Sequence, residues 1–261
     1  MKQTFGTVTA KVQGAGPTLW LFHSLLADAS SCAPLASALS DTHRVILPDL
    51  PGFGDTPAAG PGLEAVADRM AEAVSAAGTP VMVIGNGYGS FVALLMALRH
   101  PGLVSRLVLA GTGAAFSDPG RAAFTGMATA AGAKGLGTIA DTAMGRLFAP
   151  DFQASHPELM DVRRASFLAT DPAVFVDACK ALATLDLRDQ VDRLAIPVLV
   201  MVGADDEATP PPMARELAAL LPHAELVEMP GLAHVPQLQD TRRFAAAVTK
   251  FIGRTGPIPA G

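Results

Sequence analysis

The sequence predicts an α/β fold in which a mostly parallel sheet is covered by helices on both faces. Short apolar runs rich in β-branched residues recur along the chain, helical segments separate them, and one long helical stretch interrupts this alternation before it resumes. With 261 residues, 50% of them hydrophobic, the chain can bury one sizeable core. We therefore expect one domain that carries a helical insertion.

The predicted strands are near-continuous apolar runs, as expected for strands buried on both faces. A weaker run, the last of the six, completes the sheet. The six runs are Pro17–His23, Arg44–Leu50, Pro80–Asn86, Arg106–Thr112, Pro197–Ala204 and Ala224–Met229.

Helices between these runs are marked by their periodicity and their stop signals. Leu63–Ala77 is amphipathic and is followed by Gly78. Phe91–His100 stops at Pro101, and Thr241–Ile252 closes the fold. This pattern predicts helices that connect parallel strands.

Residues from about Gly120 to Asp192 contain no convincing strand. They read as several consecutive helices, with Pro157 and Pro172 near two of the helix starts, where proline is tolerated. We expect a helical lid over the edge of the sheet. The tail, residues 253–261, is rich in proline and glycine, and we expect it to fray.

The charge pattern argues against nucleic acid as a partner. The net charge is −5, the isoelectric point is near 5.6, and acids and bases are interleaved without a basic stripe. No stretch of 18 uninterrupted apolar residues occurs, and the N-terminus lacks the pattern of a signal peptide. We therefore expect a cytoplasmic protein without a membrane partner.

The two cysteines, Cys32 and Cys179, lie far apart and form neither a CxxC pair nor a cluster with histidines. We interpret both as small buried side chains in a reducing compartment. There is also no histidine and carboxylate cluster at ligand spacing and no phosphate-binding loop. The sequence therefore predicts no metal and no organic cofactor.

The strongest local motif is a strand that runs through a glycine-rich turn directly into a helix. The turn is Gly85-Asn86-Gly87-Tyr88-Gly89. In a nucleophile elbow, G-x-S-x-G, the flanking glycines let strand and helix approach while the central serine stands exposed at the top of the sheet. Here the frame is intact, and Gly87 occupies the position of the nucleophile.

Other interpretations of this turn have less support. Gly87 alone could simply relieve strain, and the string lacks the G-x-G-x-x-G spacing of a dinucleotide-binding loop. Ser90 follows the last glycine, at the helix start, where serine more often caps or packs. Ser24 and Ser90 both stay open as replacement nucleophiles.

Several motifs in a fixed order carry a resemblance to a known family. They are Phe22-His23-Ser24-Leu25 after an early strand, Asp49 to Thr56 after the next, the elbow, the helical insertion, and two late motifs for an acid and a base. Over nearly its whole length the chain resembles the α/β-hydrolase superfamily, most of all its 3-oxoadipate enol-lactonase and esterase branch. The resemblance implies a core of residues 1–119 and 193–261, with a cap formed by residues 120–192.

The resemblance also implies an acid and a histidine in the order typical of this fold. The acid falls on Asp206, in the motif that follows Gly203, with Asp205 as the adjacent competitor. His234 follows 28 residues later in Pro-Gly-Leu-Ala-His. Asp206 would orient His234 and stabilise its imidazolium while His234 acts as the base.

Further site residues follow from the same resemblance. The backbone N–H groups of Leu25 and Tyr88 occupy the positions of the oxyanion hole. Ser24 lies beside that loop, and Phe116 is a candidate for the pocket wall. Other aromatic candidates from the lid are Phe124, Phe148, Phe152 and Phe167.

A triad without its nucleophile leaves several functions open. The favoured hypothesis is hydrolysis of a small apolar ester or lactone, with water activated by the His234 and Asp206 dyad because position 87 is glycine. The alternatives are non-hydrolytic chemistry by the same dyad (a lyase or isomerase), an inactive homologue that binds a ligand, and an engineered serine-to-glycine variant. A small molecule is the expected partner, and the sequence does not predict the oligomeric state.

Overall fold

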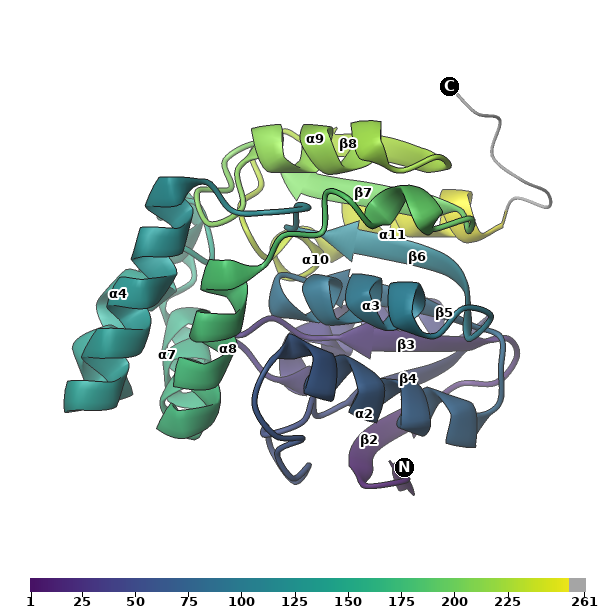
Figure 1. Cartoon of the computed structure of the whole chain (residues 1–261), viewed down its shortest axis with the longest axis horizontal. Coiled ribbons are helices and arrows are strands. Elements are labelled where there is room, and N and C mark those ends of the chain that lie inside the picture. The colour runs from purple at the N-terminus through teal and green to yellow at the C-terminus, as the bar shows by residue number, and fades with distance from the viewer. Residues whose placement is uncertain (254–261) are drawn as a thin grey trace.

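In the computed structural model, which describes residues 1–253, a single eight-stranded sheet carries helices on both faces (Figure 1). Residues 254–261, most of the tail that we expected to fray, lie outside the described residues. The strands are β1 (Lys2–Phe5), β2 (Val8–Gln13), β3 (Thr18–Phe22), β4 (Arg44–Pro48), β5 (Val81–Asn86), β6 (Val104–Ala110), β7 (Val198–Gly203) and β8 (Ala224–Met229).

The strand order is β1-β2-β4-β3-β5-β6-β7-β8. The six strands from β4 to β8 pair in parallel, whereas β1 and β2 form an antiparallel hairpin that adds to β4. The predicted mostly parallel α/β fold is confirmed. Since the carboxyl ends of parallel strands meet at one edge, the turns after these strands are brought together there.

The N-terminal hairpin is the part of the sheet that the sequence analysis missed. In β2 the side chains of Val8, Ala10 and Val12 are buried and alternate with more exposed ones, the pattern of a strand with one covered face. The run predicted at Arg106–Thr112 begins two residues earlier, at Val104. All six predicted strands agree with the structure to within two residues at each end.

Helices of the α/β core and the inserted helices together number eleven within residues 1–253. The bounds are α1 (Ala33–Leu39), α2 (Leu63–Ala77), α3 (Tyr88–Arg99), α4 (Asp118–Lys134), α5 (Ala140–Gly145), α6 (Pro150–Ser155), α7 (Pro157–Leu168), α8 (Pro172–Thr184), α9 (Pro211–Leu220), α10 (Pro236–Gln239) and α11 (Thr241–Ile252), with short 3₁₀ helices η1 (Ala29–Cys32), η2 (Leu136–Thr138) and η3 (Val191–Arg193).

The two faces of the sheet have separate hydrophobic cores. On one face α1 and α11 pack together, with Leu35 and Phe244 among their buried side chains. On the other face α2, α3 and α9 cover the sheet, and α3 is buried on nearly all sides. Burial of apolar surface on both faces is the main stabilising contribution to such a sheet.

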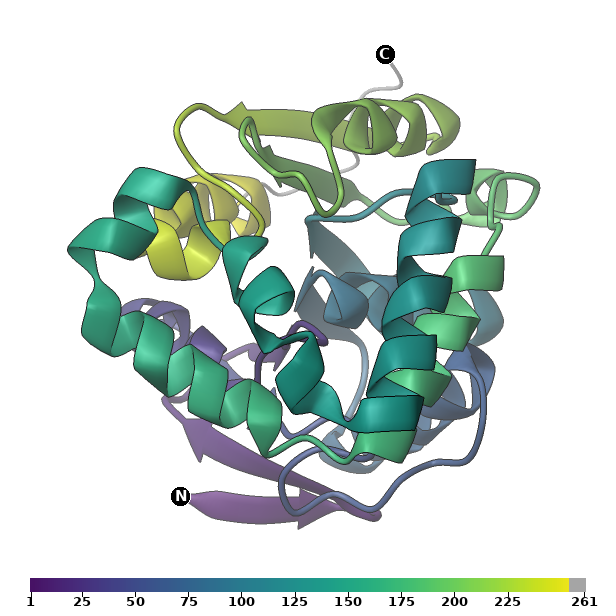
Figure 2. The same cartoon turned by 90° about the vertical axis from the view of Figure 1, so that its left-hand side faces the viewer.

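Helices α4 to α8 lie together beyond the carboxyl ends of the parallel strands (Figures 1 and 2). The chain enters and leaves this group side by side, where Ala115 and Asp186 form an isolated antiparallel bridge. Helices α4 and α8 pack along each other. The assignment of residues 120–192 as a cap that closes over a substrate stays a prediction.

Candidate active site

The glycine-rich turn joins β5 to α3, and Gly87 is the residue between them. Its backbone has φ 52° and ψ −121°, a conformation that residues with a side chain rarely adopt. Gly89 packs against the neighbouring strand so closely that a Cβ atom there would lie 2.5 Å from the Phe22 carbonyl oxygen. The turn therefore requires glycine at position 89 for the approach of α3 to β3.

Gly87 faces two polar side chains. A Cβ atom on Gly87 would lie 2.5 Å from Ser24 Oγ and 2.8 Å from His234 Nε2. These two distances place Ser24 Oγ and His234 Nε2 no more than about 5.3 Å apart. The structure thus brings together three predicted site residues from three different turns.

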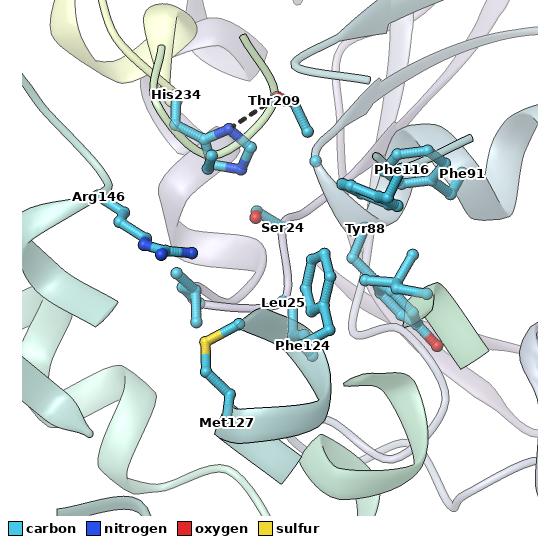
Figure 3. Close-up of a pocket in the computed structure, with 14 residues that line it drawn as sticks. Ser24, Leu25, Tyr88, Phe91, Phe116, Phe124, Met127, Arg146, Thr209 and His234 are labelled. Carbon is cyan, nitrogen blue, oxygen red and sulfur yellow. Dashed lines mark hydrogen bonds between the residues drawn. The ribbon is translucent and has the colours of Figure 1, made fainter. Parts of the chain in front are cut away.

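The predicted acid and histidine are paired. His234 Nδ1 lies 3.0 Å from Asp206 Oδ2, and both side chains are almost completely buried. Thr209 adds its hydroxyl, which donates to Asp206 Oδ2 at 2.8 Å and lies 3.2 Å from His234 Nδ1. His234 therefore has Nδ1 held by polar partners, of which Figure 3 shows Thr209, and Nε2 directed at Gly87.

Backbone groups complete the surroundings of the Asp206 carboxylate. Its Oδ1 accepts hydrogen bonds from the N–H groups of Ala208 and Thr209, at 2.8 and 2.9 Å. Burial alone would raise the pKa of Asp206, but the charge on His234 and the hydrogen bonds from His234 and Thr209 outweigh burial and lower it. Asp206 is therefore ionised at neutral pH.

Asp205, the competing acid, lies elsewhere. Its side chain is exposed, and its backbone N–H donates to the Leu232 carbonyl at 2.9 Å. This hydrogen bond ties the turn after β7 to the turn that carries His234. Of the two neighbouring aspartates, Asp206 is the one that contacts the histidine.

His23 organises the loop that contains Ser24 and Leu25. Its ring is fully buried, with Nδ1 donating to the Ser24 carbonyl at 2.9 Å and Nε2 accepting from the Leu50 N–H at 3.1 Å. One donated and one accepted bond define a neutral ring. Burial lowers the pKa of His23, in agreement with that state.

The turn of His234 is attached to the elbow by a buried amide pair. Asn86 Nδ2 donates to the His234 carbonyl at 2.8 Å, and Gln237 Nε2 donates to Asn86 Oδ1 at 3.0 Å. Asn86 directly precedes Gly87 in the chain. The backbone of the histidine is therefore fixed relative to the position at which its Nε2 is aimed.

A cavity of about 470 Å³, open mouth included, lies in front of Gly87 and His234 (Figure 3). The walls are mostly apolar, and Ser24 and Phe116 are among the residues that border the cavity. The lining residues are Ser24, Leu25, Leu26, Gly87, Tyr88, Phe91, Phe116, Phe124, Met127, Arg146, Leu182, Ala208, Thr209 and His234.

Three aromatic residues expected in this wall lie outside it. Phe148 borders a neighbouring hollow, Phe152 stacks on His156, and Phe167 is buried against Phe175. Their assignment as lining residues was wrong, because the helices of the insertion turn these side chains toward one another. Phe124 does line the cavity, with its ring 4.8 Å from that of Phe116.

The two backbone N–H groups expected in an oxyanion hole belong to residues that line the cavity. Tyr88 is the first residue of α3, so its N–H has no acceptor within the helix. The phenol of Tyr88 points away from His234 (Figure 3). Only the backbone of Tyr88 is therefore available for an oxyanion.

The sequence analysis did not single out Thr209, Asn86 or Arg146. Thr209 follows Asp206 by three residues, the spacing at which a carboxylate accepts bonds from the turn after it. No comparable spacing or motif marks Arg146, since it is one of several arginines in the helical insertion. Within residues 1–253 no group of three or more His, Cys, Asp or Glu could hold a metal ion.

Ser90, the other candidate nucleophile, is buried in α3, and its hydroxyl donates to the Ala110 carbonyl at 2.9 Å. It is absent from the cavity wall. Cys32 and Cys179 are both buried and free, as predicted. No helix in the described part of the chain is long and apolar enough to cross a membrane.

Comparison with known proteins identifies relatives along most of the chain. The alpha/beta hydrolase fold family matches residues 17–241. The pimeloyl-acyl-carrier-protein methyl ester esterase of Neisseria meningitidis is 31% identical over 255 residues, covering 93% of this chain and 79% of the relative. The esterase of the same name from Aromatoleum aromaticum is 32% identical over 258 residues, covering 92% of this chain and 94% of the relative.

Solved structures are similar over nearly the whole chain. The enol-lactonase from Burkholderia xenovorans LB400 superposes with a TM-score of 0.90 at 25% identity, covering 97% of this chain and 100% of the lactonase. A thermophilic esterase from Thermogutta terrifontis gives a TM-score of 0.86 at 26% identity, covering 97% of each chain. The predicted architecture, a mostly parallel sheet with helices on both faces, is confirmed.

Proposed function

Because the chain belongs to the α/β hydrolase fold family, we propose that it hydrolyses a small apolar ester or lactone with water that the His234 and Asp206 dyad activates. The observation that carries this proposal is the direction of His234 Nε2. It lies 2.8 Å from the point at which a side chain of residue 87 would begin, and Nδ1 is held by Asp206. Because position 87 carries no nucleophilic side chain, the base directed at it can instead take a proton from a water molecule bound in the cavity.

The reaction would proceed in two steps without a covalent intermediate. His234 Nε2 takes a proton from water while the water oxygen attacks the ester or lactone carbonyl carbon. The tetrahedral oxyanion is stabilised by the N–H groups of Leu25 and Tyr88 and by the positive end of α3. The bond to the alkoxide oxygen then breaks, and that oxygen takes the proton back from Nε2, which yields an acid and an alcohol.

Two features support an ester or lactone as the substrate. Relatives at about 30% identity are named methyl ester esterases, and a structural neighbour over the whole chain is an enol-lactonase. The cavity wall is apolar over most of its area, with Phe91, Phe116 and Phe124 on one side. Such a wall suits a short hydrocarbon chain next to the reacting carbonyl.

Ser24 supports a second mechanism for the same reaction. Its hydroxyl lies 2.5 Å from the point at which a side chain of Gly87 would begin, beside His234 Nε2. After a small rotation Ser24 Oγ could give its proton to Nε2 and attack the carbonyl itself. This route would pass through an acyl-enzyme, whereas direct attack by water would not.

The test is a panel of activated esters, thioesters and lactones, with products followed by mass spectrometry. The parent chain is compared with His234→Ala, Ser24→Ala and Gly87→Ser, and His156→Ala is the control because His156 is exposed and absent from the cavity wall. We expect the parent to hydrolyse at least one class without a burst. Loss of the base should lower kcat by about 100- to 10,000-fold, while His156→Ala should keep it.

Each other outcome identifies an alternative. Turnover that survives His234→Ala contradicts the assignment of the base. An acyl adduct on the parent that disappears in Ser24→Ala supports the serine mechanism. Products of unchanged mass indicate an isomerase, whereas hydrolysis by Gly87→Ser alone indicates a binding protein or an engineered knockout.

A further inference from the structure

Arg146 places one positive charge in the wall of a mostly apolar cavity. It directly follows α5, and its half-buried side chain lines the cavity with Gly87 and His234. Figure 3 shows the guanidinium turned toward the space between His234 and Met127, on the same side as the Ser24 hydroxyl. No acidic residue is among the 14 that line this cavity.

The guanidinium makes no hydrogen bond or ion pair with any other side chain or carbonyl in residues 1–253. By contrast, the other three arginines of this helical group are paired, Arg121 with Asp186, Arg163 with Asp28 and Arg164 with Asp141. Arg146 also borders the adjoining hollow, where Asp151, Asp205 and Glu207 lie, yet none of these carboxylates comes within ion-pair distance. A half-buried cation without a partner carries a desolvation cost that a bound anion would offset.

We propose that Arg146 binds a carboxylate at the far end of the substrate while the reacting carbonyl lies at Gly87. The ligand class is thus a small ester or lactone with an apolar chain that ends in a carboxylate. The planar guanidinium can bind a carboxylate through two parallel hydrogen bonds. This inference rests on the proposed function for the position of the carbonyl, but binding can be measured without turnover.

The probe is 6-oxoheptanoate, a methyl ketone with a terminal carboxylate that the enzyme cannot hydrolyse. Its neutral counterpart is 2-heptanone, in which a methyl group replaces the carboxylate. Calorimetric titration of the full chain should give at least about tenfold tighter binding of the acid than of the ketone, since a charge-assisted bidentate pair contributes on this scale. Arg146→Gln should remove this preference and leave the affinity for 2-heptanone within about twofold.

Arg164→Gln is the matched control. It removes an arginine of the same helical group whose partner is Asp141 and which borders a different hollow. It should keep the preference for the acid, and Arg146→Lys should keep part of it. Thermal unfolding midpoints of all variants confirm that they are folded.

Three results would overturn the proposal. They are no binding of 6-oxoheptanoate, equal affinity for acid and ketone in the parent chain, and an unchanged preference in Arg146→Gln. Displacement of the acid by inorganic phosphate of equal or higher affinity would overturn the carboxylate class in favour of a phosphate site. Ester hydrolysis with no preference for the acid would leave the proposed function in place, whereas acid binding without hydrolysis would refute that function and not the role of Arg146.

Discussion

His234 Nδ1 and Asp206 Oδ2 lie 3.0 Å apart in a buried pair, with the opposite ring nitrogen directed at Gly87. Asp206→Asn should therefore lower kcat for ester hydrolysis, by no more than the roughly 100- to 10,000-fold expected for loss of the base, because an amide can no longer stabilise the imidazolium that forms during attack. Steady-state kinetics on the preferred ester measures the loss. A change in KM with kcat preserved would contradict this role.

The same pair predicts a dependence of stability on pH. The folded protein holds the pKa of Asp206 below its ordinary value of 3.8, so the ionised carboxylate stabilises the fold above that pH, and the contribution disappears as the pH falls through the lower folded value. Urea unfolding at pH 7 and pH 3 should therefore show a smaller difference between the parent and Asp206→Asn at pH 3. An equal difference at both values would contradict the linkage.

Ser24 and position 87 compete for one space. A Cβ atom at Gly87 would lie 2.5 Å from Ser24 Oγ, and φ is +52° there. Gly87→Ser should lower the free energy of unfolding by about 1–3 kcal/mol because of backbone strain and crowding. The double variant Ser24→Gly/Gly87→Ser should recover part of this stability and hydrolyse activated esters faster than Gly87→Ser.

A double-variant cycle on urea unfolding and on burst kinetics measures this coupling. Ser24→Gly alone supplies the fourth corner of the cycle. Additive effects of the two substitutions would mean that Ser24 moves aside without cost, and crowding would then play no part.

The sequence was sufficient for features that depend on short stretches of chain. The buried strand, the turn from Gly85 to Gly89 and the following helix are contiguous, so their pattern specifies the elbow. Asp206 and His234 each follow a strand of the parallel sheet, and the edge at which such strands end brings them together. Only the choice between Asp206 and Asp205 needed the structure, since neighbouring residues in a turn point in different directions.

Features that depend on packing between distant helices were not accessible. Phe148 and Phe167 belong to the same insertion as Phe124, yet only Phe124 reaches the cavity, because helix orientation decides which side chains face inward. No sequence motif marks Arg146 as a residue of the cavity wall. The hairpin of β1 and β2 was not predicted because β2 alternates buried and exposed residues and so lacks the continuous apolar run that marks the strands covered on both faces.

Asn86 connects the elbow to the turn of His234, and this connection can be broken selectively. Asn86→Ala removes the donor to the His234 carbonyl and leaves Gln237 without its acceptor. The free energy of unfolding of this variant should be lower by about 1–3 kcal/mol. Its kcat should also be reduced, since the base is no longer fixed relative to Gly87. Gln237→Ala leaves the bond to His234 in place and should change kcat much less.

These two variants separate positioning from stability. Urea unfolding and the pH profile of kcat/KM are measured for both. Asn86→Ala should alter the profile, because the surroundings of His234 change with its backbone. An unaltered profile with reduced stability would limit Asn86 to a structural role.

Arg163 joins α7 to the loop after β3 through a nearly buried guanidinium that lies 3.3 Å from Asp28 Oδ1 and donates to Ser30 Oγ at 2.7 Å. Arg163→Met should lower the free energy of unfolding at pH 7 by about 2–3 kcal/mol. Arg164→Met, the neighbouring control, breaks an exposed pair with Asp141 and should cost about 0–1 kcal/mol.

The effect of Arg163→Met should also depend on pH. Burial would raise the pKa of Asp28, but hydroxyl donors and the Arg163 guanidinium lower it to about 2. The pair therefore stabilises the fold above the ordinary value of 3.8 and is lost as the pH falls toward 2. Urea unfolding between pH 7 and pH 2 should show the parent and Arg163→Met converging over that interval. If the gap stayed constant, the contribution of Arg163 would come from the packing of its side chain and not from the charge of Asp28.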